Sequence, residues 1–291
     1  MSLVRLALGC FVCAGIVTSP VQAAPVLMSS WEFNGNWDSS NDPSFNLIPD
    51  GGAQLVPSPF GMAASFGGGY FSGPTNPALA HADSISQVTS ASFNSGFSIV
   101  GTIRPSSASG SSSGNFLSHD TSFGDLTRVG FQFGVIYSDM SLTVQIRDID
   151  DRRLLARTPA GSLVADDWQS VAVTWDGSQI GGIQIYIGNV PITTTITPID
   201  SFGGLNGDFL PIRIGAGFAG SNGELRGFSG QIDCLALWNE ALSGSQIAGG
   251  CATNALPEPS AIPVLVSGIL GLSIVVPMRR RKILPHSILG A

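Results

Sequence analysis

Apolar and polar residues alternate with a period of two in six segments of the middle of the chain. The segments cover residues 97–103, 141–147, 169–175, 182–187, 211–215 and 231–238. Because successive side chains of a β-strand point to opposite faces, each segment is expected to form a strand with one apolar and one solvated face. Gly, Ser, Asn and Pro separate the segments, and no long stretch has helical periodicity. The pattern therefore predicts an all-β fold, a two-sheet antiparallel sandwich or jelly roll.

Two segments of the same region depart from this alternation. Residues 106–115 are mostly Ser and Gly, which are too small and polar to pack, so we expect a mobile loop there. Residues 240–247 are expected to form a short helical turn, and the chain after residue 255 is expected to be a linker.

The amino terminus has the pattern of a secretory signal peptide. Arg5 is followed by an apolar run at 6–17 and then by small residues up to a cleavage point expected between Ala23 and Ala24. A buried core helix is the alternative. The pattern predicts a signal peptide at 1–23, and therefore an exported protein.

The carboxy terminus has the pattern of a membrane anchor. Residues 261–278 contain no charged side chain and would span about 27 Å as a helix, near the thickness of a bilayer core. A basic cluster follows at once, formed by Arg279, Arg280, Arg281 and Lys282. Such a cluster favours the cytoplasmic side, so residues before 261 are expected outside, as the signal peptide also predicts.

The charge of the region between these ends excludes one class of partner. Residues 24–255 hold eight arginines and nineteen acidic residues, a net charge of −11. Nucleic-acid binding depends on basic side chains that neutralise phosphates, so a nucleic-acid partner is not expected. A domain with this charge stays soluble and can attract cations.

Two cysteines remain in the region that would be exported, Cys234 and Cys251. In an oxidising compartment such a pair is expected to form a disulfide, which in the chain-entropy model adds roughly 3 kcal/mol of stability. A metal site made by the two cysteines is the alternative.

The aromatic and histidine residues offer few candidates for chemistry. Trp31, Trp168, Trp175 and Trp238 lie in or beside expected strands, where core packing is the usual role. Trp37 lies in a loop and is the candidate for stacking on a sugar ring. The histidines at 81 and 119 stand alone among loop-like residues and are expected in surface or turn positions.

A cluster of three acidic residues is expected to lie in a solvated turn rather than in an active site. The group consists of Asp148, Asp150 and Asp151. Arginines at 147, 152 and 153 flank these carboxylates, which is typical of a solvated hairpin turn between two strands. We therefore expect no catalytic role for this group.

Several segments resemble the laminin-G-like, concanavalin-A-like jelly roll of exported bacterial proteins. The resembling segments are 31–33, 38–41, 64–71, 96–99 up to Pro105, 167–177, 185–189 and 228–243 with Gln246 and Ile247 behind it. Gly188-Asn189 replaces the family's usual Asp-Gly hairpin, and both residues tolerate positive φ. The resemblance covers about residues 28–250 and implies a concanavalin-A-like sandwich over 24–255.

This resemblance also implies a possible cofactor, because sandwiches of the family often hold a calcium ion. The positions that match the family's oxygen donors are Asp38, Asn41 and Asp233. Turn formation is the alternative role of Asp38 and Asn41, and capping of a neighbouring loop is that of Asp233.

The tail resembles the PEP-CTERM sorting signal. Its parts are Pro257, Glu258 and Pro259 in the segment 256–260, the apolar helix at 261–278 and the basic tail at 279–291. Proline on both sides of Glu258 keeps the backbone extended and accessible. The resemblance implies recognition by an exosortase, transient anchoring in the membrane, and then release to the cell surface or medium. An ordinary single-pass anchor is the alternative.

Two classes of function remain. Related glucanases place paired carboxylates on one strand in the pattern Glu-x-Asp-x-x-Glu, and that spacing is missing here. The sequence therefore favours a non-catalytic protein that binds glycans or belongs to an extracellular polymer matrix, with no enzyme activity. The alternative is a polysaccharide-acting glycoside hydrolase or lyase on the same fold.

Overall fold

The structure, a computed structural model, describes residues 25–71, 80–109, 112–120, 129–150, 152–178, 182–197, 201–205, 209–218 and 225–251. The predicted signal peptide, the Pro-Glu-Pro segment, the apolar helix and the basic cluster all lie outside these residues and stay predictions. Among the residues described, no helix has the length and apolar character needed to cross a membrane.

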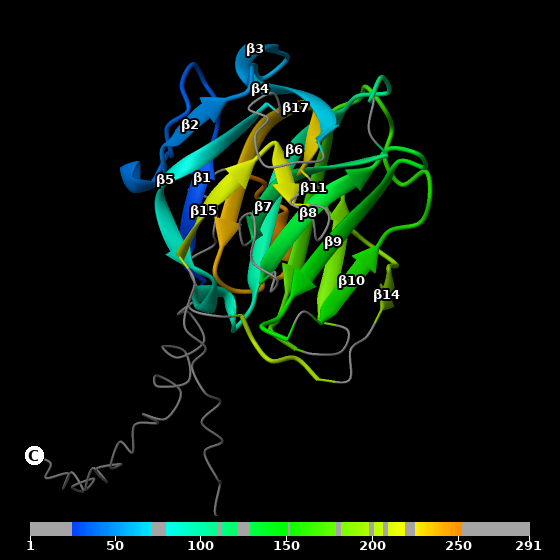
Figure 1. Cartoon of the computed structure of the whole chain (residues 1–291). Helices are drawn as coiled ribbons and strands as arrows, with labels where there is room; N and C mark the ends of the chain where they lie inside the picture. The colour runs from blue at the N-terminus through cyan, green and yellow to red at the C-terminus, as the bar shows by residue number, and fades with distance from the viewer. Residues whose placement is uncertain are drawn as a thin grey trace, which may run out of the picture.

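Within the described ranges, the strands form two antiparallel sheets (Figure 1). The first sheet has the order β13-β12-β11-β6-β17-β4-β3, and β1 and β16 also pair with β17. The bounds of its strands are β1 Leu27–Trp31, β3 Gln54–Ser58, β4 Gly61–Phe71, β6 Phe97–Pro105, β11 Gln169–Trp175, β12 Ile183–Ile187, β13 Val190–Ile192, β16 Ala216–Phe218 and β17 Leu225–Trp238.

The second sheet has the order β14-β10-β9-β8-β7-β15-β5-β2. Its strands are β2 Leu47–Asp50, β5 His81–Thr89, β7 Ser113–Asp120, β8 Gly130–Ile136, β9 Ser141–Arg147, β10 Arg153–Arg157, β14 Thr195–Thr197 and β15 Phe209–Ile214. The helical elements that the structure describes are short, η1 Pro43–Phe45, η2 Ser90–Phe93 and α1 Gly244–Ile247.

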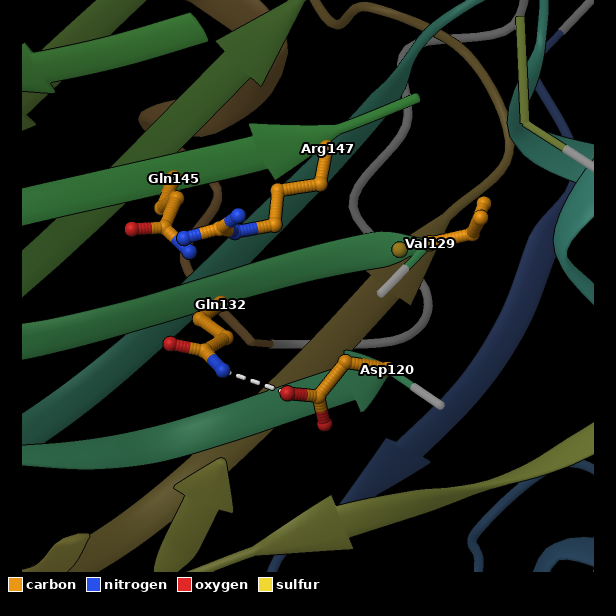
Figure 2. A pocket seen from close by; sticks show the side chains of 6 residues that line it. Asp120, Val129, Gln132, Gln145 and Arg147 are labelled. Atoms are coloured by element: carbon orange, nitrogen blue, oxygen red, sulfur yellow. Dashed lines mark hydrogen bonds between the residues drawn. The ribbon is translucent and has the colours of Figure 1, made fainter. Parts of the chain in front are cut away.

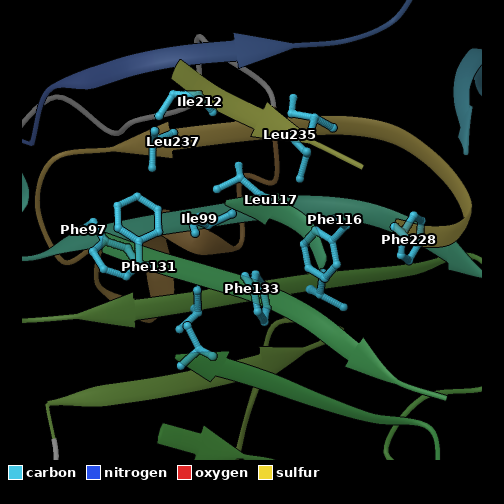
Figure 3. Packing of buried hydrophobic residues seen from close by; sticks show 14 of the residues in the cluster. Phe97, Ile99, Phe116, Leu117, Phe131, Phe133, Ile212, Phe228, Leu235 and Leu237 are labelled. Atoms are coloured by element: carbon cyan, nitrogen blue, oxygen red, sulfur yellow. The ribbon is translucent and has the colours of Figure 1, made fainter. Parts of the chain in front are cut away.

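The main core lies between the two sheets and is rich in aromatic rings (Figure 3). Phe97 of β6 stacks on Phe131 of β8 with ring centroids 4.2 Å apart, which joins the two sheets directly. Phe116 and Phe133 pack beside this pair from β7 and β8, and both are fully buried. The alternation predicted from the sequence therefore buries one face of each sheet against the other.

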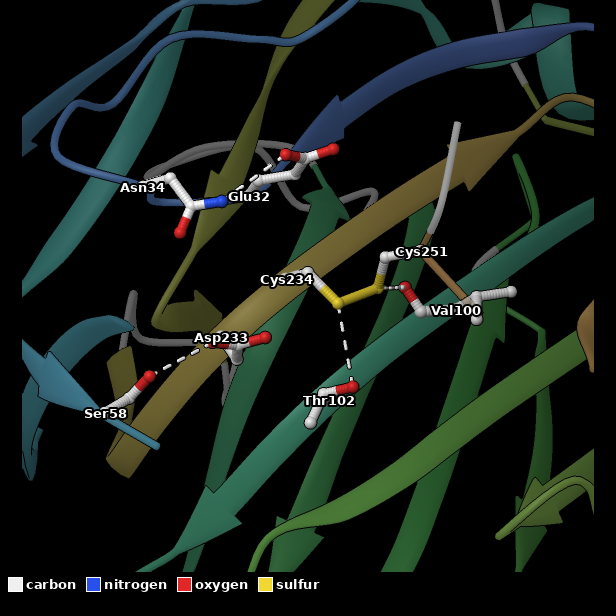
Figure 4. Close-up of a disulfide and its surroundings, with 8 residues drawn as sticks. All are labelled: Glu32, Asn34, Ser58, Val100, Thr102, Asp233, Cys234 and Cys251. Carbon is white, nitrogen blue, oxygen red and sulfur yellow. Dashed lines mark hydrogen bonds between the residues drawn. A yellow bond between two sulfur atoms is a disulfide. The ribbon is translucent and has the colours of Figure 1, made fainter. Parts of the chain in front are cut away.

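A smaller core lies on the outer face of the first sheet. Val100 of β6, Ala172 of β11 and Trp238 of β17 are covered there by Leu242 and Ile247 of the segment that contains α1. A disulfide between Cys234 and Cys251 holds the end of this segment against β6, with Cys251 Sγ 3.7 Å from the Val100 carbonyl oxygen (Figure 4). The disulfide predicted from the sequence is therefore present in the structure.

The predicted all-β sandwich and its strands are confirmed. Apart from Gly182 and Gly215 at segment ends, all six alternating segments lie in strands, β6, β9, β11, β12, β15 and β17. The turn between β12 and β13 has φ of 58° at Gly188 and 66° at Asn189, the conformation that these two residues were expected to tolerate. The helical turn expected within 240–247 is α1.

One expected loop is partly wrong. Ser113, Gly114 and Asn115 belong to β7 rather than to a mobile loop, because they pair with Ile136, Val135 and Gly134 of β8. Small side chains are required here, since a Cβ on Gly114 would lie 2.3 Å from the Gly227 carbonyl oxygen. Close packing of β7 against β17 thus explains why a strand has the composition of a loop.

Candidate functional site

A small hollow of about 10 Å³, room for about one water molecule, lies on the outer face of the second sheet, over β7, β8 and β9 (Figure 2). Its floor is Gly130 of β8, which pairs with Asp120 of β7 and Arg147 of β9. A Cβ on Gly130 would lie 1.9 Å from the His119 carbonyl oxygen, so the position requires glycine. The flanking strands carry longer side chains, and the hollow lies between them next to this glycine.

Hydrogen bonds hold the side chains on the β7 side of the hollow. Gln132 of β8 donates through Nε2 to Asp120 Oδ2, and its Oε1 accepts from Asn115 Nδ2 at 3.1 Å. Asn115 lies over Gly134, whose missing Cβ makes room for the amide. This chain of contacts fixes the orientation of the Gln132 amide, which the strand alone would leave free.

The β9 side of the hollow is formed by Gln145 and Arg147 (Figure 2). Gln145 pairs with Gln132 across β8 and β9, so both amides point outward from the same row. Within the described residues no hydrogen bond engages the side chain of Gln145, although it is half-buried. Its amide lies among the side chains that line the hollow.

The side chains that line the hollow include both hydrogen-bond donors and hydrogen-bond acceptors. The lining combines two amides, one guanidinium and one carboxylate, which together can donate to and accept from several hydroxyl groups. Among the described residues that line the hollow, Asp120 is the one carboxylate. Paired carboxylates of the kind that glycoside hydrolysis uses are not formed by these side chains.

None of these lining residues was singled out from the sequence. Gln145 and Arg147 were expected on the solvated face of a strand, as found, whereas β8 was not recognised as a strand. The available signal was the alternation of Phe131, Phe133 and Val135 with Gly130, Gln132 and Gly134. Glycines weaken that signal because they are also typical of turns.

The structure brings Trp37 into contact with the core. Its ring lies edge-on to Phe33 at 5.5 Å and to Phe66 at 6.2 Å, and the side chain is half-buried. These contacts give Trp37 a packing role, and its contact with a sugar stays an untested prediction.

The three residues predicted to hold calcium occupy two separate places. Asn41 Oδ1 accepts from the Ser30 backbone N–H at 2.9 Å, and Asp38 accepts from the Asn36 amide. Ser39 bridges to Trp31 of β1, which in turn pairs with Leu235, so β1 lies between this loop and β17. Asp38 and Asn41 therefore lie in a different part of the fold from Asp233, and calcium binding by these residues stays an untested prediction.

Asp233 instead has its own surroundings beside the disulfide (Figure 4). Ser58 Oγ donates to its carboxylate at 3.3 Å. Burial raises the pKa of Asp233, the Ser58 bond opposes this, and the negative charge of Glu32 raises the pKa further. Asp233 therefore accepts a hydrogen bond from Ser58 and lies close enough to Glu32 for the two carboxylates to repel each other.

Two side chains expected at the surface are buried. His119 of β7 is fully buried, with Nδ1 3.5 Å from the Pro211 carbonyl oxygen and Nε2 3.3 Å from Ser90 Oγ. Asp148 is also fully buried, and its carboxylate accepts from the backbone N–H groups of Asp150, Arg152 and Gly203. Asp148 thus joins the β9–β10 hairpin to the segment 201–205, and both surface expectations were wrong.

The predicted role of the strand tryptophans in core packing is confirmed for three residues. Trp31, Trp175 and Trp238 are buried, as expected for tryptophans in strands. Trp168 is half-buried and packs edge-on against the exposed Phe60, with ring centroids 5.7 Å apart. This pair is the exception to the pattern of core aromatics.

Comparison with known proteins identifies the family to which the sandwich domain belongs. The family profile Laminin_G_3, described as the concanavalin A-like lectin/glucanases superfamily, matches residues 81–248. No curated protein matches the chain in sequence. The laminin-G-like, concanavalin-A-like resemblance is therefore confirmed.

Similar solved structures include the binding domain of botulinum neurotoxin serotype G, with a TM-score of 0.52, 11% identity, and coverage of 77% of this chain and 50% of that one. The binding domain of botulinum neurotoxin DC in complex with SialylT has a TM-score of 0.51 and 15% identity, over 77% and 49% of the two chains. The same binding domain in complex with rat synaptotagmin II gives 0.50 and 16%, over 76% and 50%. This chain spans about half the length of each of them, and at such identities the likeness shows the fold alone.

Proposed function

Because this chain belongs to the concanavalin A-like lectin/glucanases superfamily, we propose that it is a non-catalytic glycan-binding protein and that the polar side chains around the small hollow over β8 contact the glycan. The observation that carries the proposal is the row of outward amides, Gln132 and Gln145, beside Arg147 and Asp120 above the Gly130 floor. Sugar hydroxyls donate and accept at once, and this lining offers both kinds of partner.

The similar solved structures support a binding role without deciding the ligand. The structure of the botulinum neurotoxin DC binding domain with SialylT is a complex with that ligand, and the one with rat synaptotagmin II is a complex with a protein. Between these two classes, we favour a glycan because four of the six residues that line the hollow carry amide or charged groups, whereas protein interfaces have apolar, aromatic centres.

Replacing Gln145 with alanine is expected to weaken glycan binding. The change removes one hydrogen bond to the ligand without breaking a bond within the described protein, which predicts a loss of affinity of about 3- to 10-fold. The measurement is a glycan-array screen of the purified protein, followed by titration calorimetry with the glycans it identifies.

Gln87→Ala is the matched control for this test. Gln87 is an exposed glutamine on β5 of the same sheet, away from the hollow, so its loss should leave affinity unchanged. Equal affinity in the Gln145→Ala and wild-type proteins would contradict the site. Turnover of a polysaccharide that one carboxylate substitution abolishes would replace the proposal with the hydrolase or lyase alternative.

We propose in addition that the protein is exported, held briefly in a membrane, and sorted by an exosortase-type enzyme. The support is the sequence of the two ends, the signal peptide at 1–23 and the Pro257-Glu258-Pro259 segment followed by the apolar residues 261–278 and the basic cluster. Four cations at 279–282 would hold the far end of the helix on the cytoplasmic side, because moving them through hydrocarbon is costly.

In a host with an exosortase, the mature protein is expected to lose all residues after about 259. Changing Pro257, Glu258 and Pro259 together to alanine should leave an uncut, membrane-bound form, and deleting the exosortase should have the same effect. Fractionation and mass spectrometry of the carboxy terminus measure the outcome, with Thr253→Ala/Asn254→Ala as a control that leaves the motif intact. A wild-type protein that stays whole in the membrane would identify the tail as an ordinary anchor.

A further inference from the structure

A second polar hollow lies on the outer face of the first sheet, on the opposite side of the sandwich. Its volume is about 190 Å³, and its polar lining is formed by Ser65, Arg104, Ser106, Asp166, Ser229 and Gln231. Gln231 of β17 pairs with both Ser65 of β4 and Arg104 of β6, so these three side chains form one outward row. The smaller core and the disulfide cover the other half of this face and leave the hollow open.

The charged groups of this second hollow are held in place. Arg104 donates through Nε to the Asp166 carbonyl oxygen at 2.8 Å and lies 3.5 Å from Gln231 Oε1. Asp166 has a positive φ of 59° and donates its backbone N–H to the Pro105 carbonyl oxygen at 2.7 Å. Two hydrogen bonds from Ser107 to the Asp166 carboxylate lower its pKa, which keeps it ionised at neutral pH. The hollow therefore offers a cation and an anion in fixed positions, with no net charge.

An aromatic pair, the half-buried Trp168 and the exposed Phe60, lies near this hollow. Trp168 precedes Gln169, which pairs with Ile103, so Trp168 lies across from Arg104 at the end of the row. Phe60, from the β3–β4 turn, is 58% exposed and meets Trp168 edge-on. A sugar ring has an apolar C–H face and polar edges, so it fits an aromatic surface next to fixed polar groups.

We propose that this second hollow, with Phe60 and Trp168 near it, binds one unit of a neutral polysaccharide. Its volume is below the range of sites for drug-sized ligands, which suits a single ring. The balanced charge of the lining and the net charge of −11 of residues 24–255 disfavour a polyanionic chain. The next step rests on the proposed function of the first hollow. With one site on each of the two opposite faces, one molecule would join two polysaccharide chains.

Titration with neutral hexasaccharides tests the second site. Cellohexaose, laminarihexaose, xylohexaose and mannohexaose serve as probes, with oligogalacturonate as the charged comparison. Trp168→Ala and Phe60→Ala should each weaken binding at one site by about tenfold, while Trp168→Phe should restore most of it. Gln145→Ala should weaken binding only at the first hollow, over β8. Wild-type protein should also raise the viscosity of the matching long polysaccharide, and each single-site variant should not.

Phe209→Ala is the control, because Phe209 is an exposed phenylalanine on β15 of the other sheet. Melting curves separate binding from packing, since a purely structural pair would lower the melting temperature and leave the affinity of folded protein unchanged. The second site would be overturned by that structural result, by binding of oligogalacturonate alone, or by a lack of binding to every neutral probe. Loss of affinity in Gln145→Ala with none in Trp168→Ala would overturn it while supporting the first hollow, and the reverse would overturn only the first.

Discussion

Replacing Cys234 and Cys251 together with alanine is expected to lower the free energy of unfolding by about 3 kcal/mol. The bond closes a loop between residues 17 positions apart, and removing it restores the conformational freedom of that loop in the unfolded chain. The segment that carries α1 would also lose its anchor at Cys251, next to the smaller core. Chemical denaturation of the purified protein measures the loss.

Reduction of the disulfide provides the control for this prediction. Dithiothreitol should shift the denaturation midpoint of the wild-type protein by the same amount and leave that of the double variant unchanged. A wild-type midpoint that is the same with and without the reductant would show that the bond contributes nothing to stability.

Acidification is expected to destabilise the protein through His119. Burial lowers the pKa of its imidazole from 6.5 to about 4, against a smaller opposite effect of the hydrogen bond to the Pro211 carbonyl. That carbonyl can only accept, so Nδ1 carries the proton, and Nε2 is left to accept from Ser90 Oγ.

The sign of this effect follows from the lowered pKa. The folded state holds the neutral ring, so its stability is complete above pH 6.5 and is lost as the pH falls from 6.5 toward 4. The expected loss is about 2 kcal/mol at pH 5 and about 3 kcal/mol at pH 4.

Denaturation curves of the wild type and of His119→Gln between pH 7 and pH 4.5 isolate the contribution. The variant should be less stable at pH 7 because its packing against Phe93 and Phe131 changes, but it should lack the loss between pH 6.5 and 4.5. His81→Gln, at the half-buried start of β5, should retain it. Parallel pH profiles for the wild type and His119→Gln would rule out the buried imidazole as the cause.

Local pattern was sufficient to predict the strands with a clear alternation. Residues 141–147 and 169–175 form β9 and β11 with the predicted bounds, because in each the apolar residues that face the main core recur at every second position. The disulfide was also predictable, since two cysteines in a chain that is predicted to be exported have few other fates. Strands β7 and β8 were missed because their glycines, needed for close approach of neighbouring strands, are locally indistinguishable from turn residues.

The two hollows, in contrast, depend on pairing between distant strands. Asp120, Gln132 and Gln145 come from three strands, and only the register of β7, β8 and β9 brings them to one row. In the same way, Arg104 and Gln231 are 127 positions apart and meet through the pairing of β6 with β17. Register is a property of the whole sheet, so no single segment reports it.

The sequence by itself determined the fold class, the solvated face of β9 and the pairing of Cys234 with Cys251, because alternation and cysteine content act locally or through a single bond. Only the tertiary structure decided that His119 and Asp148 are buried and that the loop of Asp38 lies a strand apart from Asp233. Burial and distance are set by which elements pack together, and that information is spread over the whole chain rather than carried by the residues themselves.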